Sequence, residues 1–237
     1  MPDFHLFHSP GTCGRVTLVA LEMIGAPYRV TIVRHFGDGP GDPSFGFGDS
    51  SYRALNPTGV LPTLLIDGKP LTENIAILFT LARLFPAAEL LPIRDPISEG
   101  EALSRLSFCV SHLHPILTRI NRPQFFCDAS QEATERTREM AITMMDARLG
   151  VVEPVLARQP WWMGERFSIA DVYLQWVTEM MRTRGLDFSA FPAIVAHIEN
   201  VKQQPAMRRA LDLEAKYRAD LEAAGIVYYP IYPSPKY

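Results

Sequence analysis

Residues 3–33, DFHLFHSPGTCGRVTLVALEMIGAPYRVTIV, hold the pattern that decides the fold. In residues 3–8, polar and apolar side chains alternate and several are aromatic, which predicts a short strand. A turn follows at residues 9–12, and apolar residues then recur at helical spacing until Gly25, which favours a helix that ends there. Residues 28–33 predict a second strand. A strand, a helix and a strand in this order predict a βαβ unit with parallel strands and a right-handed crossover.

The pattern that follows completes a small α+β domain. Five glycines and two prolines within residues 35–51 predict an irregular loop. Two short apolar runs then flank Asp67-Gly68, which is a strong signal for a two-residue hairpin. A further helix is marked by apolar residues at 78, 81, 82 and 85 and ends at Pro86. Residues 1–85 therefore predict the order β-α-β-loop-β-β-α.

From residue 86 onward the pattern changes. Three prolines within residues 86–97 predict a linker, and beyond it strand signals nearly vanish. Residues 98–225 therefore predict an all-helical domain, with helices over 98–122, 131–157, 168–184, 191–203 and 206–223. The best-marked helix begins at Ser168, where Asp171 can reach back to the cap residue's amide as a capping box. The Pro- and Tyr-rich tail, residues 226–237, is predicted to pack back on a domain face or a dimer groove.

Composition excludes several classes of partner. The chain has 237 residues, 47% of them apolar, and a net charge of −3, so it can bury a core but offers no basic surface for nucleic acid or an anionic membrane. Its three cysteines are too few and odd in number for a disulfide framework, which favours a reducing compartment. No stretch approaches the ~20 apolar residues of a membrane-spanning helix, and the N-terminus lacks a signal-peptide pattern. We expect a cytoplasmic protein without nucleic-acid or membrane partners.

Cys13 is the first candidate for chemistry, because it lies where the first strand turns into the first helix. The partial positive charge and free amides of a helix N-terminus favour the thiolate, which can bind, activate or form a mixed disulfide with a second thiol. The alternative is a small buried residue that packs under the helix. Val16 takes the place of the second cysteine of a Cys-x-x-Cys pair, which disfavours a thioredoxin-type reductase.

Two further segments of the first domain could bind a peptide-like ligand. A cis bond before Pro62 would turn the N–H and C=O of Leu61 outward, as one rung of a ladder, although general frequencies by themselves favour trans. Thr72 is a candidate helix cap, and the free amides of the turn after it suit a carboxylate. Glu73 can accept an ammonium group there, or it simply complements the helix dipole.

Four segments, taken in their order and spacing, resemble the glutathione transferase superfamily. They are SPGTC at 9–13, NPTGVLP at 56–62, LTENIAI at 71–77 and FSIADV at 167–172. The resemblance spans roughly residues 3–215 of the chain. It implies a thioredoxin-like N-terminal domain followed by an all-α helical-bundle domain. It also implies an enzyme that takes glutathione and a small apolar electrophile held between the domains, and a homodimer.

The same resemblance implies which residues bind glutathione. Pro62 is similar to the family's cis-proline, and Leu61, next to Val60, presents its backbone to the cysteinyl part of the tripeptide. Glu73 resembles the residue that holds the γ-glutamyl ammonium group. Asn74 replaces the serine that binds the γ-glutamyl carboxylate in most members, and its amide could donate the same bond.

Cys13 resembles the cysteine of the bacterial beta class, which lies in a Pro-Gly-x-Cys turn beside the glutathione sulfur. Ser9 and Thr12 are nearby hydroxyls that could activate the sulfur instead, and Arg15 could add positive charge near it. His114 falls where the beta class has a histidine that faces the active-site cleft; a histidine satisfied within the core or cleft is the alternative.

We expect no metal, because His112 and His114 stand at i and i+2 and point to different faces of a helix. The phenylalanines of residues 35–49 suggest an apolar flap, with an irregular surface loop as the alternative. The expected function is conjugation of the glutathione thiolate to an apolar electrophile, as in detoxification. One alternative is a thiol-disulfide, deglutathionylating or ether-cleaving enzyme that uses Cys13, and another is a non-catalytic glutathione-binding scaffold of the same fold.

Overall fold

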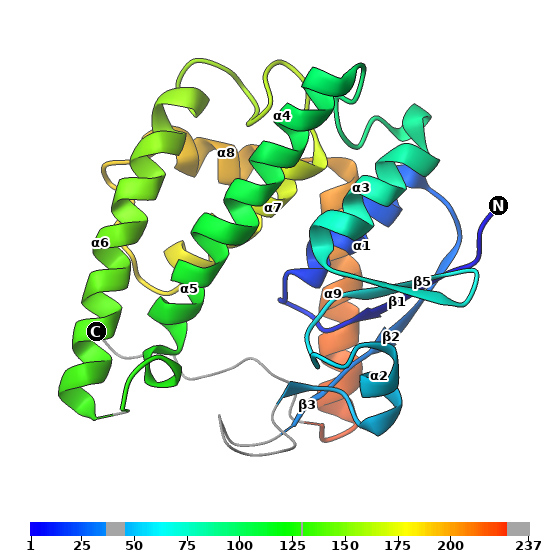
Figure 1. Cartoon of the computed structure of the whole chain (residues 1–237), viewed down its shortest axis with the longest axis horizontal. Helices are drawn as coiled ribbons and strands as arrows, with labels where there is room; N and C mark the ends of the chain where they lie inside the picture. Colours follow the sequence, from blue (N-terminus) through cyan, green and yellow to red (C-terminus); the bar gives the residue numbers. More distant parts are fainter. Residues whose placement is uncertain (37–45, 129, 227–237) are drawn as a thin grey trace. The chain divides into compact units, whose positions relative to one another are not determined.

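The computed structural model describes residues 1–36, 46–128 and 130–226, which form the helices and strands labelled in Figure 1. The predicted tail lies outside the described residues except for Ile226, and so does most of the proposed flap. Among the described residues, no helix combines the length and apolar character needed to cross a membrane.

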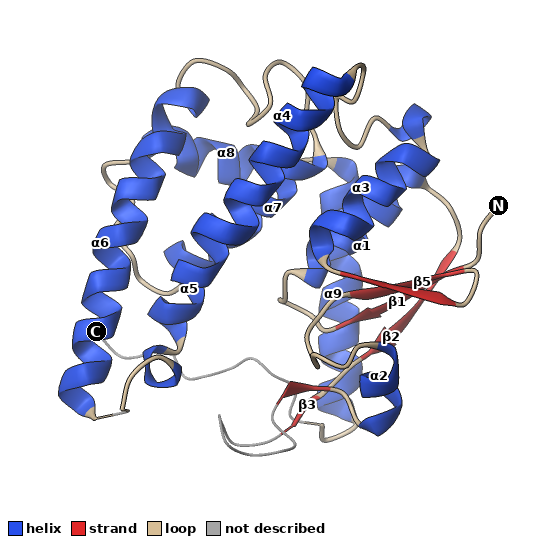
Figure 2. Ribbon diagram, in the orientation of Figure 1, coloured by secondary structure: helices blue, strands red, loops and turns tan. Residues whose placement is uncertain are grey.

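The first unit is built on a four-stranded sheet with the strand order β2-β1-β5-β6 (Figure 2). Strand β1 pairs in parallel with β2 and antiparallel with β5, as the predicted βαβ unit and hairpin require. Asp67 and Gly68 form the hairpin turn with φ values of 50° and 77°, the left-handed conformation that such two-residue turns need. The strands are β1 (Phe4–His8), β2 (Tyr28–Ile32), β5 (Thr63–Ile66) and β6 (Lys69–Thr72).

Two helices of this unit pack together on one face of the sheet: α1 (Gly14–Ile24) contacts β1, and α3 (Asn74–Leu84) contacts β6. The buried residues of β1, which include Phe4 and Leu6, form the sheet side of this core. Helix α1 ends at Gly25, whose φ of 70° is the left-handed cap that glycine adopts without strain. The predicted thioredoxin-like fold is confirmed.

Part of the predicted loop at 35–51 has regular structure, and the prediction is wrong there. Short strands β3 (His35–Phe36) and β4 (Gly46–Phe47) pair antiparallel, and α2 (Ser50–Leu55) follows them. The Asp49 carboxylate caps α2 by accepting from two backbone N–H groups, and Tyr52 packs in a small cluster beneath it. Tyr52 contacts the ring of Phe7, on the sheet face opposite to α1. The sequence did not predict this helix because the glycines dominate the local signal, whereas the Asp49 cap and the buried Tyr52 ring are sufficient for a helix of six residues.

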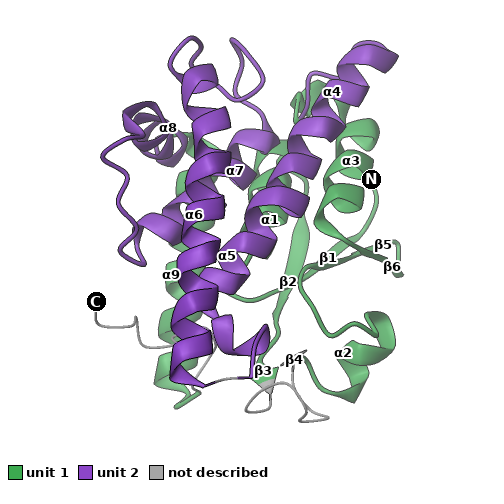
Figure 3. Cartoon of the chain, turned by 60° about the vertical axis from the view of Figure 1, so that its left-hand side comes forward, with its two compact units in different colours: residues 1–90, 204–234 green, residues 91–203, 235–237 purple. Residues whose placement is uncertain are grey.

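The chain divides into two compact units, Met1–Leu90 with Gln204–Ser234 and Leu91–Gln203 with Pro235–Tyr237 (Figure 3). The boundary after Leu90 falls inside the predicted linker, where η1 (Pro86–Ala88) forms one short turn. The last helix, α9 (Pro205–Ala223), packs on α1 and therefore belongs to the first unit, whereas the sequence grouped it with residues 98–225. Arg209 of α9 holds the Glu22 side chain and carbonyl at the end of α1.

The second unit is helical, as predicted, with a different break in its first segment. Instead of one helix over 98–122, a π-helical stretch separates α4 from α5. Pro115 explains the break, because it has no N–H and its ring conflicts with the carbonyl four residues earlier. The backbone widens just before it, and the His114 N–H bonds to the Cys109 carbonyl five residues back. The elements are α4 (Pro96–Ser107), η2 (Phe108–Leu113), α5 (His114–Asn121), η3 (Pro123–Phe125), α6 (Gln131–Leu156), α7 (Ile169–Arg182) and α8 (Pro192–Lys202).

Helix α7 is central to this unit, and its predicted capping box is present. The buried Asp171 carboxylate accepts hydrogen bonds from the Ser168 N–H and hydroxyl. It also accepts one from the Trp162 N–H and is 2.9 Å from His197 Nε2. Asp171 therefore joins the start of α7 to the preceding loop and to α8.

Candidate active site

The turn that carries Cys13 is held by its own hydroxyl and carbonyl groups. Thr12 donates its hydroxyl proton to the Ser9 carbonyl at 2.7 Å, and its oxygen lies 3.4 Å from the Gly14 N–H. Because that proton is already committed, Thr12 is poorly placed to activate a bound thiol. Ser9 is buried, and its hydroxyl makes no hydrogen bond to any described residue, so it remains a possible donor.

Cys13 is the cap residue of α1 and is partly exposed. Its Sγ–H donates to the Leu61 carbonyl at 3.3 Å. Burial of the sulfur raises the pKa of the Cys13 thiol to about 12, and the nearby Glu73 carboxylate pushes it in the same direction. The expectation that the helix N-terminus favours a thiolate is wrong for this state, because loss of hydration outweighs the hydrogen bonds that favour the anion.

The Leu61–Pro62 bond is cis, and both residues are buried. The Leu61 N–H makes no hydrogen bond to a described residue, and its carbonyl faces the Cys13 thiol. The Val60 carbonyl, by contrast, accepts from the Tyr52 hydroxyl at 2.6 Å and from the Asn56 amide at 2.9 Å. The backbone that is open to a ligand is therefore that of Leu61, and Val60 offers at most its side chain, which is 47% exposed.

Glu73 precedes α3 in an unusual backbone conformation, with φ 67° and ψ 117°. Such values strain a residue with a side chain and are concentrated at ligand sites. The exposed Glu73 side chain makes no hydrogen bond or ion pair with a described residue. Thr72, predicted as the cap, is instead the last residue of β6. The sequence carries no signal for this strain, because the position holds neither glycine nor asparagine.

Asn74 is buried, and its side chain is used within the protein. Its Nδ2 donates to the Cys13 carbonyl at 2.8 Å, while its Oδ1 accepts from the Thr17 hydroxyl at 2.8 Å. The expectation that this amide serves a ligand carboxylate does not fit that arrangement. Asn74 instead ties the start of α3 to the turn at Cys13, which leaves the backbone amides at the start of α3 as donors for an anion.

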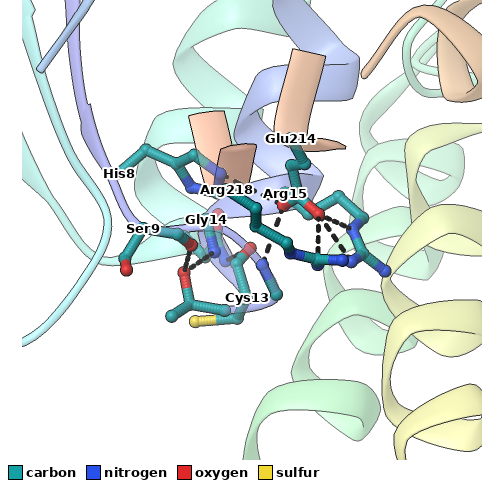
Figure 4. Close-up of polar contacts among 10 residues, drawn as sticks. His8, Ser9, Cys13, Gly14, Arg15, Glu214 and Arg218 are labelled. Atoms are coloured by element: carbon teal, nitrogen blue, oxygen red, sulfur yellow. Dashed lines mark hydrogen bonds and ion pairs between the residues drawn. The ribbon is translucent and has the colours of Figure 1, made fainter. Parts of the chain in front are cut away.

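The structure adds a residue that sequence reasoning missed, Glu214 of α9. Its carboxylate binds the Arg15 guanidinium, at 2.6 Å from the nearer nitrogen, and His8 Nε2 at 3.1 Å (Figure 4). Arg15 is therefore paired with Glu214, which also lies 3.4 Å from a terminal nitrogen of Arg218, and is not a cation held for the sulfur. One sequence signal existed: Glu214 interrupts the buried stripe formed by Met207, Ala210 and Leu221 on α9.

His114 belongs to the second unit, where it lies against aromatic residues of α7. Its Nδ1 is 3.2 Å from the Tyr173 hydroxyl, and its ring meets Trp176 edge to face at 4.7 Å between centroids. Burial lowers the pKa of His114 to about 4, so the imidazole is neutral near pH 7. A neutral ring can accept or donate a hydrogen bond, but it does not place a positive charge in a site.

Comparison with known proteins shows a family to which this chain is similar. A family model described as the C-terminal domain of glutathione S-transferase matches residues 108–205. Glutathione S-transferase GstA from Escherichia coli O157:H7 is 29% identical over 210 residues, which cover 88% of this chain and 98% of that protein.

Solved structures agree along almost their whole length. A sphingomonad glutathione S-transferase complexed with glutathione is 31% identical, with a TM-score of 0.73, and the match covers 89% of this chain and 98% of that one. The bacterial beta-class enzyme of Sphingomonas chungbukensis gives the same identity, TM-score and coverage. From this identity over nearly the full length of both chains, we conclude that the protein belongs to the glutathione transferase superfamily and resembles its bacterial beta class.

Proposed function

We propose that this protein is an enzyme that binds glutathione on its first unit and transfers the glutathione thiolate to a small apolar electrophile. The observation that carries the proposal is the Leu61 N–H at the cis bend, which bonds to none of the described residues and lies next to the Cys13 thiol. An extended cysteinyl residue would pair with this backbone as with a neighbouring strand. The match to a relative whose structure contains glutathione supports the same ligand.

The γ-glutamyl end of the ligand would lie at the start of α3. Glu73 supplies an exposed carboxylate for its ammonium group, and the first-turn amides of α3 supply donors for its carboxylate. Replacement of Glu73 by Ala is expected to raise KM for glutathione while leaving kcat nearly unchanged, because the contact is far from the reacting sulfur. Glu101→Ala, at an exposed glutamate of α4, is the matched control.

In the transfer step, the glutathione thiolate would form a C–S bond to the electrophile as the leaving group departs with its electron pair. Cys13, whose Sγ–H donates to the Leu61 carbonyl, would lie beside that sulfur as a neutral thiol. Its raised pKa argues against Cys13 as the attacking nucleophile, since the thiolate is the reactive form of cysteine. Conjugation is therefore favoured over the thiol-disulfide, deglutathionylating and ether-cleaving alternatives.

Two measurements test this proposal. Calorimetry is expected to detect glutathione binding at or below millimolar concentration, and a general aryl halide is expected to be turned over. Cys13→Ser and Cys13→Ala should largely retain conjugation and should abolish any disulfide exchange that the wild type shows. Glutathione binding without turnover of any electrophile would support the scaffold alternative, and no binding would contradict both readings.

The homodimer and the cytoplasmic location also remain proposals. Light scattering with size-exclusion chromatography tests the first, and fractionation of cells tests the second.

A further inference from the structure

Glu214 joins three parts of the first unit around the turn that carries Cys13. Its Oε1 lies 3.1 Å from His8 Nε2, at the end of β1, and accepts from the Gly11 N–H at 3.0 Å, within the turn. Its Oε2 accepts from Arg15 Nε at 3.0 Å and from an Arg15 terminal nitrogen at 2.6 Å, in the first turn of α1. Figure 4 shows the side chains of His8 and Arg15 converging on this one carboxylate.

These contacts are made in the interior. The Glu214 side chain is 1% exposed, and Arg15 and His8 are also buried. A buried carboxylate is costly unless charge and hydrogen bonds compensate it, and Arg15 supplies both. The Arg15 guanidinium and the His8 contact overcome the effect of burial and hold the pKa of Glu214 at about 2, so the carboxylate is ionised at all pH values at which the protein would work.

The anchor points bracket the sulfur-bearing residue. Gly11 precedes Cys13 by two positions and adopts a φ of 82°, which only glycine takes readily, so this amide is aimed at Glu214 by the turn itself. Arg15 follows Cys13 by two positions. Between them, Gly14 packs so closely on His8 that an added Cβ would lie 2.6 Å from His8 Nδ1. The backbone on both sides of Cys13 therefore packs against the His8 ring and the Glu214 carboxylate, which are hydrogen-bonded to each other.

We propose that Glu214 is a positioning residue for the transfer reaction, and that α9 through it sets where the turn at residues 9–14 holds the glutathione sulfur. The proposal rests on the proposed function, because it assigns a role in the same site. Glu214 touches neither the Leu61 backbone nor Glu73, which are the expected contacts of the remainder of the ligand. Its loss should therefore misplace the sulfur without removing the ligand's main anchors.

The test compares Glu214→Gln and Glu214→Asp with Glu222→Gln. Glutamine keeps the size but replaces one accepting oxygen by a donor, and aspartate keeps the charge but is too short to reach Gly11 and Arg15 together. Glu222 is exposed on the same helix and loses the same charge, so it is the matched control. The measurements are amide hydrogen exchange of residues 9–15, the apparent pKa of the bound glutathione thiol from its ultraviolet absorbance, and steady-state kinetics with an aryl halide.

Both Glu214 variants are expected to exchange faster at residues 9–15, to raise the pKa of the bound thiol and to lower kcat on the order of 10–100-fold, the size that follows from small misplacement of reacting groups. KM for glutathione should change less than about threefold on the same argument. Glu222→Gln should match the wild type. The aspartate variant keeps the test decisive if the glutamine variant does not fold.

A lower melting temperature together with unchanged exchange, thiol pKa and kcat would show a role in stability alone and overturn the proposal. A rise in KM for glutathione at constant kcat would overturn it too, because Glu214 would then serve ligand binding. If the wild type binds no glutathione, the proposed function fails and the kinetic part of this proposal with it. Exchange at residues 9–15 still decides in that case whether Glu214 holds the turn.

Discussion

Thiol exchange at Cys13 is expected to be slow at neutral pH and to accelerate far into the alkaline range. With the pKa of its thiol at about 12, roughly one Cys13 sulfur in 10,000 is ionised at pH 8, against about a quarter for an ordinary cysteine. A more basic thiolate is also a stronger nucleophile, which raises the exchange rate by a factor of about 40 and partly compensates for this loss. The net expectation is exchange about 60-fold slower than at an unperturbed thiol.

The assay is exchange with 2-hydroxyethyl disulfide, a small neutral reagent, followed by mass spectrometry that separates Cys13 from Cys109 and Cys127. A synthetic peptide of residues 9–16 supplies the same local sequence without the fold, as the reference. Between pH 8 and pH 10 the rate at Cys13 should rise about tenfold per pH unit, whereas the peptide should level off near its own pKa.

The shape of the pH profile distinguishes electrostatics from access. Steric protection lowers all rates by one factor and leaves the midpoint where it was, whereas desolvation of the sulfur moves the midpoint upward. A Cys13 rate that levels off below pH 9 would refute the reasoning. It would show that the helix N-terminus stabilises the thiolate after all.

Three further predictions concern stability and protonation. The pKa of Glu214 is lower in the folded state than its ordinary value of 4.5, so its contribution to the free energy of unfolding is complete above pH 4.5 and is lost as the pH falls towards 2. In urea unfolding of the wild type, about 3 kcal/mol of stability should be lost over this pH range. Glu214→Gln should not show this change of stability with pH. Burial lowers the pKa of His114 to about 4, so between pH 6.5 and pH 4 this residue is protonated in the unfolded chain and neutral in the folded one. The free energy of unfolding should therefore fall as the pH is lowered from 6.5 towards 4. An NMR titration midpoint of His114 near 6.5 in the folded protein would contradict this. Ser168→Ala should cost about 1 kcal/mol of unfolding free energy. Asp171→Ala should cost more, because each buried donor that it orphans adds about 1–3 kcal/mol; equal losses in denaturant unfolding would argue against the shared role of Asp171.

Local patterns predicted most of the secondary structure, because each signal acts over a few residues. Strand β1, the helix that ends at Gly25, the Asp67-Gly68 hairpin and the Ser168 capping box all depend on neighbours in the chain. The same locality explains the misses. A short helix after a glycine-rich stretch needs Tyr52 to be buried by distant residues, which no local pattern reports.

The protonation state and hydrogen-bond partners of the candidate site residues differ from those that the sequence led us to expect. The family resemblance assigned Cys13, Leu61 and Asn74 to one glutathione site, and the sequence predicted a thiolate at Cys13 and a ligand contact for the Asn74 amide. In the structure, the Cys13 thiol is partly exposed, loss of hydration raises its pKa to about 12, and the Asn74 amide donates to the Cys13 carbonyl. The sequence could not predict these states, because the hydration of a polar side chain and its hydrogen-bond partners are set by the residues that the fold packs around it.

The sequence alone determined the order of the elements, the division into a sheet-containing part and a helical part, and the family, because periodicity, turn residues and motif spacing are properties of the chain. Tertiary structure alone decided that α9 closes onto the first unit and that Glu214 meets His8, 206 positions away, around the turn at Cys13. Ion pairs and burial act between residues that the fold brings together, and their strength depends on removal from water. The spacing of residues along the chain does not show which polar groups the fold will remove from water.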